Sequence, residues 1–208
     1  MRILLLIALL LFSCSPHRSQ SQSERNNSAA QQPQKFQVIV PMDTWEAIYF
    51  KEVNERATIA RLPNLRAAAL PKDDLETRVW MGFGLTALRG LILKRSAGQW
   101  TGIHVQGIHP RLASRDYQKT LQTPKSGWDE CWRRLVNEGI LTLPDARSIN
   151  CEGGALDGIS YVVETNLDNT YRTYMYDNPQ FAKCKEAKQM IKIVEILADE
   201  FGAQLRGD

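Results

Sequence analysis

The sequence predicts an α+β fold, a two-layer sandwich in which one antiparallel sheet carries helices on one face. Two observations predict it. Between residues 75 and 201 the predicted elements follow the order hairpin, helix, hairpin, helix. Each of these helices has a single apolar stripe and must therefore pack on another layer, and a sheet with one apolar face is the simplest partner.

The predicted domain begins with a short apolar strand at residues 36–40, FQVIV, which stops at Pro41. Residues 44–62, TWEAIYFKEVNERATIARL, contain many helix formers behind a candidate cap at Asp43 or Thr44. The β-branched and aromatic residues of this segment also allow a strand. We predict a helix here.

The first hairpin follows. LETRVWMGF (residues 75–83) and LRGLILKR (88–95) have the composition of strands, and QWTGIHVQ (99–106) returns as the partner strand. Ser96-Ala97-Gly98 predicts a three-residue turn, with glycine where a left-handed conformation is needed.

The first of the two striped helices is predicted to begin at Ser126, which can cap it, with Asp129 at the position of a variant capping box. Gly139 ends it. Its apolar side chains recur at helical spacing and form one stripe: Trp128, Cys131, Trp132, Leu135 and Val136.

The pattern then recurs. GISYVVETN (158–166) and TYRTYMYD (170–177) predict a second hairpin around the turn Leu167-Asp168-Asn169. A final helix starts near Cys184 and stops at Gly202. Its apolar stripe again has helical spacing: Ala187, Met190, Ile191, Val194, Leu197 and Phe201.

The N-terminus has the layout of a signal peptide: Arg2, an apolar run from Ile3 to Phe12, and then small polar residues. Ten apolar residues are too few to span a membrane, which takes about 20. The stretch Leu11-Phe12-Ser13-Cys14 resembles the lipobox of bacterial lipoproteins. This resemblance implies cleavage before Cys14, which then carries lipid, and Ser15 after it favours the outer membrane, facing the periplasm. An ordinary secretory signal cut near Ala29-Ala30 is the alternative.

Three regions follow from this layout: a signal peptide at residues 1–13, a lipidated Cys14 with a flexible polar tether at 14–35, and a single α+β domain at 36–208. The chain has a net charge of +3, all of which comes from Arg2 and the tether. The domain itself is neutral, which argues against nucleic acid as a partner. We expect partners at the membrane, through the lipid anchor, and in the cell envelope.

Export to an oxidising compartment favours disulfides. With Cys14 lipidated, Cys131, Cys151 and Cys184 remain, so at least one thiol is unpaired. Cys151 and Cys184 flank the second hairpin and can close it at its base, so we predict a disulfide between them. Cys131 lies within the apolar stripe of a predicted helix, where it is expected to be buried.

The strand TYRTYMYD contains the main candidate for a binding surface. Strand alternation places Arg172, Tyr174 and Tyr176 on one face, opposite Tyr171, Thr173 and Met175. If the first set faces solvent, its phenols and guanidinium can bind a partner by stacking and hydrogen bonding. The alternative is cross-strand stabilisation, with Glu164 opposite or diagonal to Arg172.

Trp80 is the second candidate, because it shares a strand face with Gly82 and Gly84 in VWMGFGLTALRG. Glycines in a strand mark a close approach of a ligand or of a bulky neighbouring side chain. The glycines therefore either make room for a ligand beside Trp80 or let a bulky neighbour or a helix pack close.

Familiar catalytic and metal-binding patterns are absent from the sequence. His104 and His109 have no carboxylate at ligand spacing, the cysteines form no CxxC pair, and no GxSxG, SxxK or phosphate-binding loop occurs. We therefore predict no metal, cofactor or catalytic residue, and a non-enzymatic envelope lipoprotein whose sheet face binds a protein or small-molecule partner.

Two alternatives stay open. One is an envelope hydrolase with a site assembled from sequence-distant residues, in which His104 is the general base and Glu164 or Asp168 orients it. The other is an inhibitor of a secreted enzyme, presenting a rigid loop at Ser96–Gly98 or Leu167–Asn169.

Overall fold

The computed structural model describes residues 37–39, 44–82, 88–108, 118–151 and 158–202. The predicted signal peptide, Cys14 and the tether lie outside these residues, as do His109 and Gly84. Everything described belongs to one compact unit, residues 34–208.

The centre of this unit is a seven-stranded sheet in the order β1-β7-β6-β2-β3-β4-β5. All neighbouring strands are antiparallel except β1 and β7, which are parallel. The strands are β1 (Gln37–Ile39), β2 (Leu75–Met81), β3 (Leu88–Ser96), β4 (Gln99–Ile108), β5 (Gln118–Thr120), β6 (Ser160–Leu167) and β7 (Thr170–Asp177). The α-helices are α1 (Thr44–Ile59), α2 (Trp128–Asn137) and α3 (Lys185–Phe201), and short 3₁₀ helices span Leu65–Ala67 and Arg147–Ile149.

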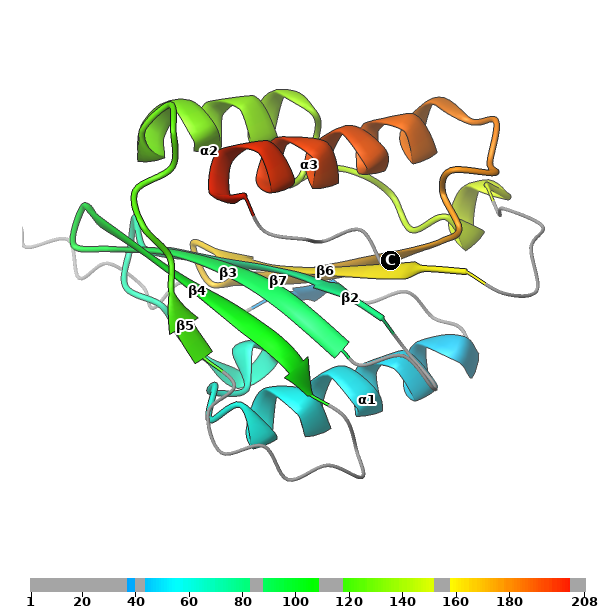
Figure 1. Cartoon of the computed structure of the whole chain (residues 1–208). Helices are drawn as coiled ribbons and strands as arrows, with labels where there is room; N and C mark the ends of the chain where they lie inside the picture. Colours follow the sequence, from blue (N-terminus) through cyan, green and yellow to red (C-terminus); the bar gives the residue numbers. More distant parts are fainter. Residues whose placement is uncertain (1–36, 40–43, 83–87, 109–117, 152–157, 203–208) are drawn as a thin grey trace, which may run out of the picture. The chain divides into compact units, whose positions relative to one another are not determined.

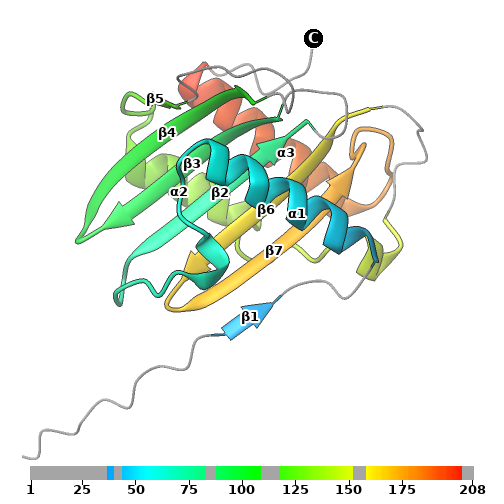
Figure 2. The same ribbon diagram turned by 90° about the horizontal axis from the view of Figure 1, so that it is seen from below.

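Helices cover both faces of this sheet. Helices α2 and α3 lie on one face and α1 lies on the other (Figure 1), where it crosses the strands obliquely (Figure 2). We call these the α2/α3 face and the α1 face. The α+β class is as predicted, but the prediction of two layers with helices on one face is wrong, because α1 adds a third layer.

Each face has its own apolar core, because alternate residues of one strand point to opposite sides of the sheet. Val79, Leu91 and Val163 pack beneath α2 and α3. Trp80 and Val162 pack against Val53 and Ala57 of α1. All seven residues of β2 are buried. The second core was not predicted from the sequence. Glu76 and Arg78 lie at alternate positions of β2, and this pattern is typical of a strand with one face in solvent.

Both hairpins are one residue tighter than predicted. Ser96 pairs with Gln99 and Leu167 pairs with Thr170, which leaves two-residue turns. All four turn residues have positive φ: 48° and 77° at Ala97 and Gly98, and 49° and 58° at Asp168 and Asn169. Turns of this kind match the right-handed twist of the strands, and glycine, asparagine and aspartate tolerate the conformation best.

The predicted helix at residues 44–62 is present as α1 but ends at Ile59, and the ends of α2 and α3 agree with prediction except at one residue. Cys184 is the N-cap of α3, and Gly202 ends the helix with φ 59°. The N-cap of α2 is Gly127 and not the predicted Ser126. Ser126 instead donates its backbone N–H and its hydroxyl to the carboxylate of Glu200, at 2.9 and 2.8 Å. This links the start of α2 to the end of α3.

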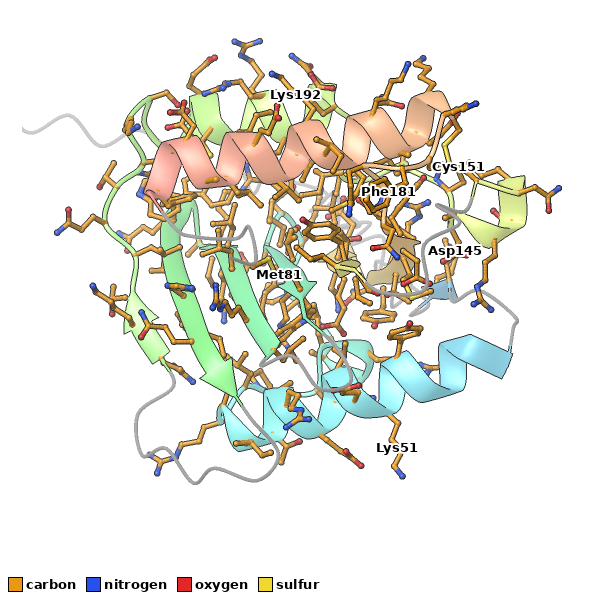
Figure 3. The ribbon with its side chains drawn as sticks, turned by 45° about the vertical axis from the view of Figure 1, so that its right-hand side comes forward. Lys51, Met81, Asp145, Cys151, Phe181 and Lys192 are labelled. Atoms are coloured by element: carbon orange, nitrogen blue, oxygen red, sulfur yellow. A yellow bond between two sulfur atoms is a disulfide. The ribbon has the colours of Figure 1, made fainter. Side chains whose placement is uncertain are left out.

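The predicted disulfide between Cys151 and Cys184 is confirmed, with the two Cα atoms 5.9 Å apart. It closes a loop that contains the β6–β7 hairpin, and the backbone N–H of Cys151 donates to the oxygen of Ala146 at 2.8 Å, next to Asp145 (Figure 3). Cys131 is free and buried, as expected. Burial raises the pKa of its thiol to about 12, so the thiol is protonated and unreactive at neutral pH.

None of the helices in the described part of the chain is long and apolar enough to cross a membrane.

Candidate functional site

The predicted binding strip on β7 is not a surface. Tyr174 and Tyr176 are 2% and 0% exposed. Their hydroxyls donate to the backbone oxygens of Ile140 and Pro144 at 2.9 and 2.8 Å. The predicted alternation is right, but this face is covered by the segment that follows α2, which satisfies both phenols. The prediction that the two tyrosines face solvent is therefore wrong.

Arg172 shares this face and is half-buried. Its guanidinium donates to the backbone oxygen of Leu141 at 2.9 Å and to that of Leu143, and lies 5.1 Å from the ring centre of Tyr174. It ties the covering segment to the sheet. The alternative pairing with Glu164 does not form, because Glu164 is opposite Thr173 and points to the other face.

Trp80 is fully buried on the α1 face. Its ring lies on Gly90 of β3, where an added Cβ would be 2.6 Å from a ring carbon. The glycine beside Trp80 therefore makes room for the packed Trp80 ring and not for a ligand. This glycine is Gly90 on the neighbouring strand β3, and not the predicted Gly82 or Gly84.

The indole nitrogen of Trp80 donates to Glu164 at 2.7 Å, and the hydroxyl of Tyr171 donates to the other carboxylate oxygen at 2.8 Å. Glu164 is 1% exposed, and its cross-strand neighbour is Arg78. Burial, together with the adjacent carboxylate, raises the pKa of Tyr171 far above its usual value. These groups form a buried polar cluster on the α1 face of the sheet.

His104 and Glu164 do not meet. The register places His104 in one row with Leu91, Val79 and Val163, on the α2/α3 face. Glu164 follows Val163 and points to the α1 face. Asp168, the other suggested orienter, accepts from the backbone N–H of Asp73 at 3.3 Å in the β6–β7 turn. The predicted hydrolase pairing is therefore not assembled.

A site that the sequence did not predict lies around His104. A hollow of about 920 Å³ opens on the α2/α3 face, between the strands β3, β4 and β5 and the C-terminal end of α3. Its lining includes four basic side chains and two apolar ones: Arg89, His104, Lys119, Lys125, Leu121 and Phe201.

A β-bulge shapes the strand side of this hollow. Gln106 and Gly107 lie between Val105 and Ile108, whereas Arg89 alone lies between their partners Gly90 and Leu88. Gly107 accommodates the extra residue with φ 41°. Bulges of this kind re-aim side chains and are common beside functional sites. Gly107, within the strand segment QWTGIHVQGI, was the one sequence signal for this bulge.

Basic side chains outnumber acidic ones among the described residues that line the hollow. Lys119 lies directly opposite His104, and it makes no ion pair with the described residues. Lys125 pairs with the exposed Asp199 at 3.1 Å. The pKa of His104 is lowered by burial and, to a smaller extent, by Arg89 and Lys119, so its imidazole is neutral at neutral pH.

Glu200 is the one acid among the described lining residues. It is 4% exposed, and its carboxylate accepts from Ser126 and from Arg134. The negative charge of Glu200 is therefore compensated by Arg134 and Ser126 and is not directed into the hollow. By contrast, the buried Nε2 of His104 has no hydrogen-bond partner in the described part of the molecule.

The described residues contain no group of three or more histidines, cysteines or acids that could hold a metal ion. No protein-family model and no curated protein matches the chain.

Proposed function

We propose that this protein is a non-enzymatic lipoprotein of the bacterial cell envelope whose folded domain binds a protein or small-molecule partner in the hollow around His104. Cys14 carries the lipid, residues 15–35 are the tether, and the protein is held at the outer membrane facing the periplasm. The observation that carries the proposal is the hollow itself. It exposes cationic and apolar groups on the α2/α3 face of the sheet.

The lipid anchor is tested by the intact mass of the mature protein from membrane and soluble fractions. A membrane-bound species that starts at Cys14 and carries the mass of acyl chains is expected. A soluble, unacylated species cut near Ala30 would contradict the anchor and would move the protein to the periplasm or the exterior.

The binding site is tested by capture of envelope partners on the purified protein and on two charge variants. Lys119→Glu inverts the charge of the hollow. Lys51→Glu makes the same change on α1, on the opposite side of the sheet from Lys192 and α3 (Figure 3), and serves as the control. Both side chains are exposed, so neither change should disturb folding.

We expect a partner that wild type and Lys51→Glu retain and that Lys119→Glu loses. A partner retained equally by all three proteins would place the binding surface elsewhere. Equal loss from both variants would indicate a general charge effect and would equally contradict the site.

A further inference from the structure

We infer that the hollow around His104 binds an oxyanion, a phosphate or carboxylate group, which contacts Lys119 beside the His104 ring. This inference rests on the proposed function and names the chemistry of the ligand.

The first support is a local excess of positive charge in a neutral domain. Among the described lining residues, Lys119 is the cation that makes no ion pair, Lys125 pairs with the exposed Asp199, and Arg89 lowers the pKa of His104. The one acid among these described residues, Glu200, is turned into a buried cluster with Ser126 and Arg134. Oxyanions are the ligands that such a surface attracts, since the bonds between a cationic donor and an anionic acceptor are stronger than neutral ones.

The second support is the pair formed by Lys119 and His104. The two residues are directly opposite each other in the β4–β5 register. Among the described residues Lys119 makes no ion pair, and the buried Nε2 of His104 has no hydrogen-bond partner. An oxyanion that accepts from Lys119 would therefore compensate its charge, and from beside the half-buried ring it would favour the protonated form of His104.

The end of α3 decides where in the hollow the oxyanion lies. The carbonyl groups at a helix C-terminus carry partial negative charge and repel an anion. One of them, of Glu200, accepts from the backbone N–H of Lys125 at 3.4 Å. The oxyanion is therefore expected on the strand side, at Lys119 and His104, and not against α3.

The remaining wall suggests what is attached to the oxyanion. Leu121 and Phe201 line the hollow, and Phe201 is held 5.7 Å from Trp128, measured between ring centres. An apolar or aromatic group next to the oxyanion would lie on these side chains.

Bound oxyanion should also change the protonation of His104. The charged groups that line the hollow with it are Arg89 of β3, Lys119 of β5, Lys125, and Glu200 of α3. In the free protein, burial and two of these cations lower the pKa of His104. A nearby anion favours the imidazolium, so the protein takes up a proton on binding, and affinity rises as pH falls.

The test is calorimetric titration of the mature protein in nonionic detergent, with detergent alone as the blank. The probes are phenyl phosphate, benzoate and the uncharged benzyl alcohol, which share an aromatic ring. Sulfate, whose charge is constant, is titrated from about pH 8 to about pH 5.5, across the range where histidine changes charge.

We expect at least one anionic probe to bind wild type, and benzyl alcohol to bind at least about tenfold more weakly. Lys119→Gln should weaken the anionic probe about fivefold, and Lys51→Gln should leave it unchanged. Affinity for sulfate should rise as pH falls in wild type and stay flat in His104→Gln. Binding of phenyl phosphate alone identifies a phosphate ligand, and binding of benzoate alone a carboxylate.

Benzyl alcohol that binds as well as the anions, or unchanged affinity in Lys119→Gln, would overturn the inference. If no probe binds although Lys119→Glu still abolishes partner capture, the oxyanion is wrong and the proposed function stands. If partner capture is also unaffected, both are wrong. Circular dichroism of each variant excludes misfolding as the cause of a loss.

Discussion

On the α2/α3 face of the sheet, buried tyrosines donate to backbone carbonyls, whereas on the α1 face the same sheet encloses charged side chains. Tyr174 and Tyr176 extend a mostly apolar core and bind the segment after α2. Glu164, Glu76 and Arg78 lie beneath α1 and the following 3₁₀ segment, each with a charged or polar partner. The difference teaches that burial in this protein follows the available hydrogen-bond partners and not polarity alone.

The two polar arrangements should differ in how much stability depends on them. A buried carboxylate satisfied by two donors leaves both donors unpaired when it is removed. A neutral phenol that binds one backbone oxygen leaves a single acceptor unpaired. The following predictions test this contrast between the faces, from the largest effect to the smallest.

Glu164→Ala on the α1 face should lower the free energy of unfolding by about 3–5 kcal/mol, as expected for breaking a buried charged cluster. The cause would be the unpaired indole of Trp80 and hydroxyl of Tyr171. Urea denaturation measures the loss. Adding Tyr171→Phe to Glu164→Ala removes one unpaired donor, so the double variant should lose less than the sum of the two single losses. Strict additivity would contradict the cluster.

The disulfide between Cys151 and Cys184 should contribute about 3 kcal/mol, since it closes a long loop in the unfolded chain. It joins the loop after α2 to the N-cap of α3 and so stabilises the α2/α3 face. Replacing both cysteines by serine and comparing urea midpoints measures it. Replacing Cys131 by alanine in both the wild-type and the double-serine backgrounds should leave the difference between their midpoints unchanged, because that thiol is not part of the disulfide. A negligible effect of the double serine variant would show that packing alone holds this region.

Tyr174→Phe on the α2/α3 face should cost about 1 kcal/mol, the usual net value of one hydrogen bond. The ring stays packed and the backbone oxygen of Ile140 loses its donor. Thermal and urea unfolding measure the change. A loss as large as that of Glu164→Ala would remove the contrast between the faces.

The smallest expected effect is the dependence of stability on the protonation of His104. Its pKa is lowered in the folded protein from the ordinary value of 6.5, so the unfolded chain binds a proton more readily. This contribution to stability is present above pH 6.5 and is lost as pH falls through the histidine range. The difference in unfolding free energy between wild type and His104→Gln, measured over that range without anions, should shift in favour of the variant as pH falls. A contribution that grew with acidity would contradict the neutral ring.

Local elements were largely predictable because their signals are local. Most of the α3 stripe, its end at Gly202 and the disulfide between Cys151 and Cys184 follow from spacing and turn chemistry. Within the stripe, Ile193 and Ile196 are buried although they were not predicted, and Ile191 is only half-buried. The facial alternation of β7 was also predicted. Its exposure was not, because the residues that cover Tyr174 and Tyr176 come from a segment about 30 positions earlier in the chain.

The site was harder to predict than the elements. Arg89, His104 and Lys119 are on three strands, and nothing in their spacing indicates that they share a face and a hollow. Their proximity depends on the pairing of β3, β4 and β5 and on the bulge at Gly107.

The sequence by itself determined the three α-helices, the strands of the two hairpins, the α+β class and the disulfide, because capping, turn formation and apolar periodicity act over a few residues. It did not indicate the edge strand β5, which was predicted as a polar connection. Only the tertiary structure decided that α1 covers the second face of the sheet, that Glu164 and Arg78 are buried, and that a cationic hollow opens at His104. These depend on contacts between residues far apart in the chain, and a charged residue can be placed inside or outside only when its partner is known.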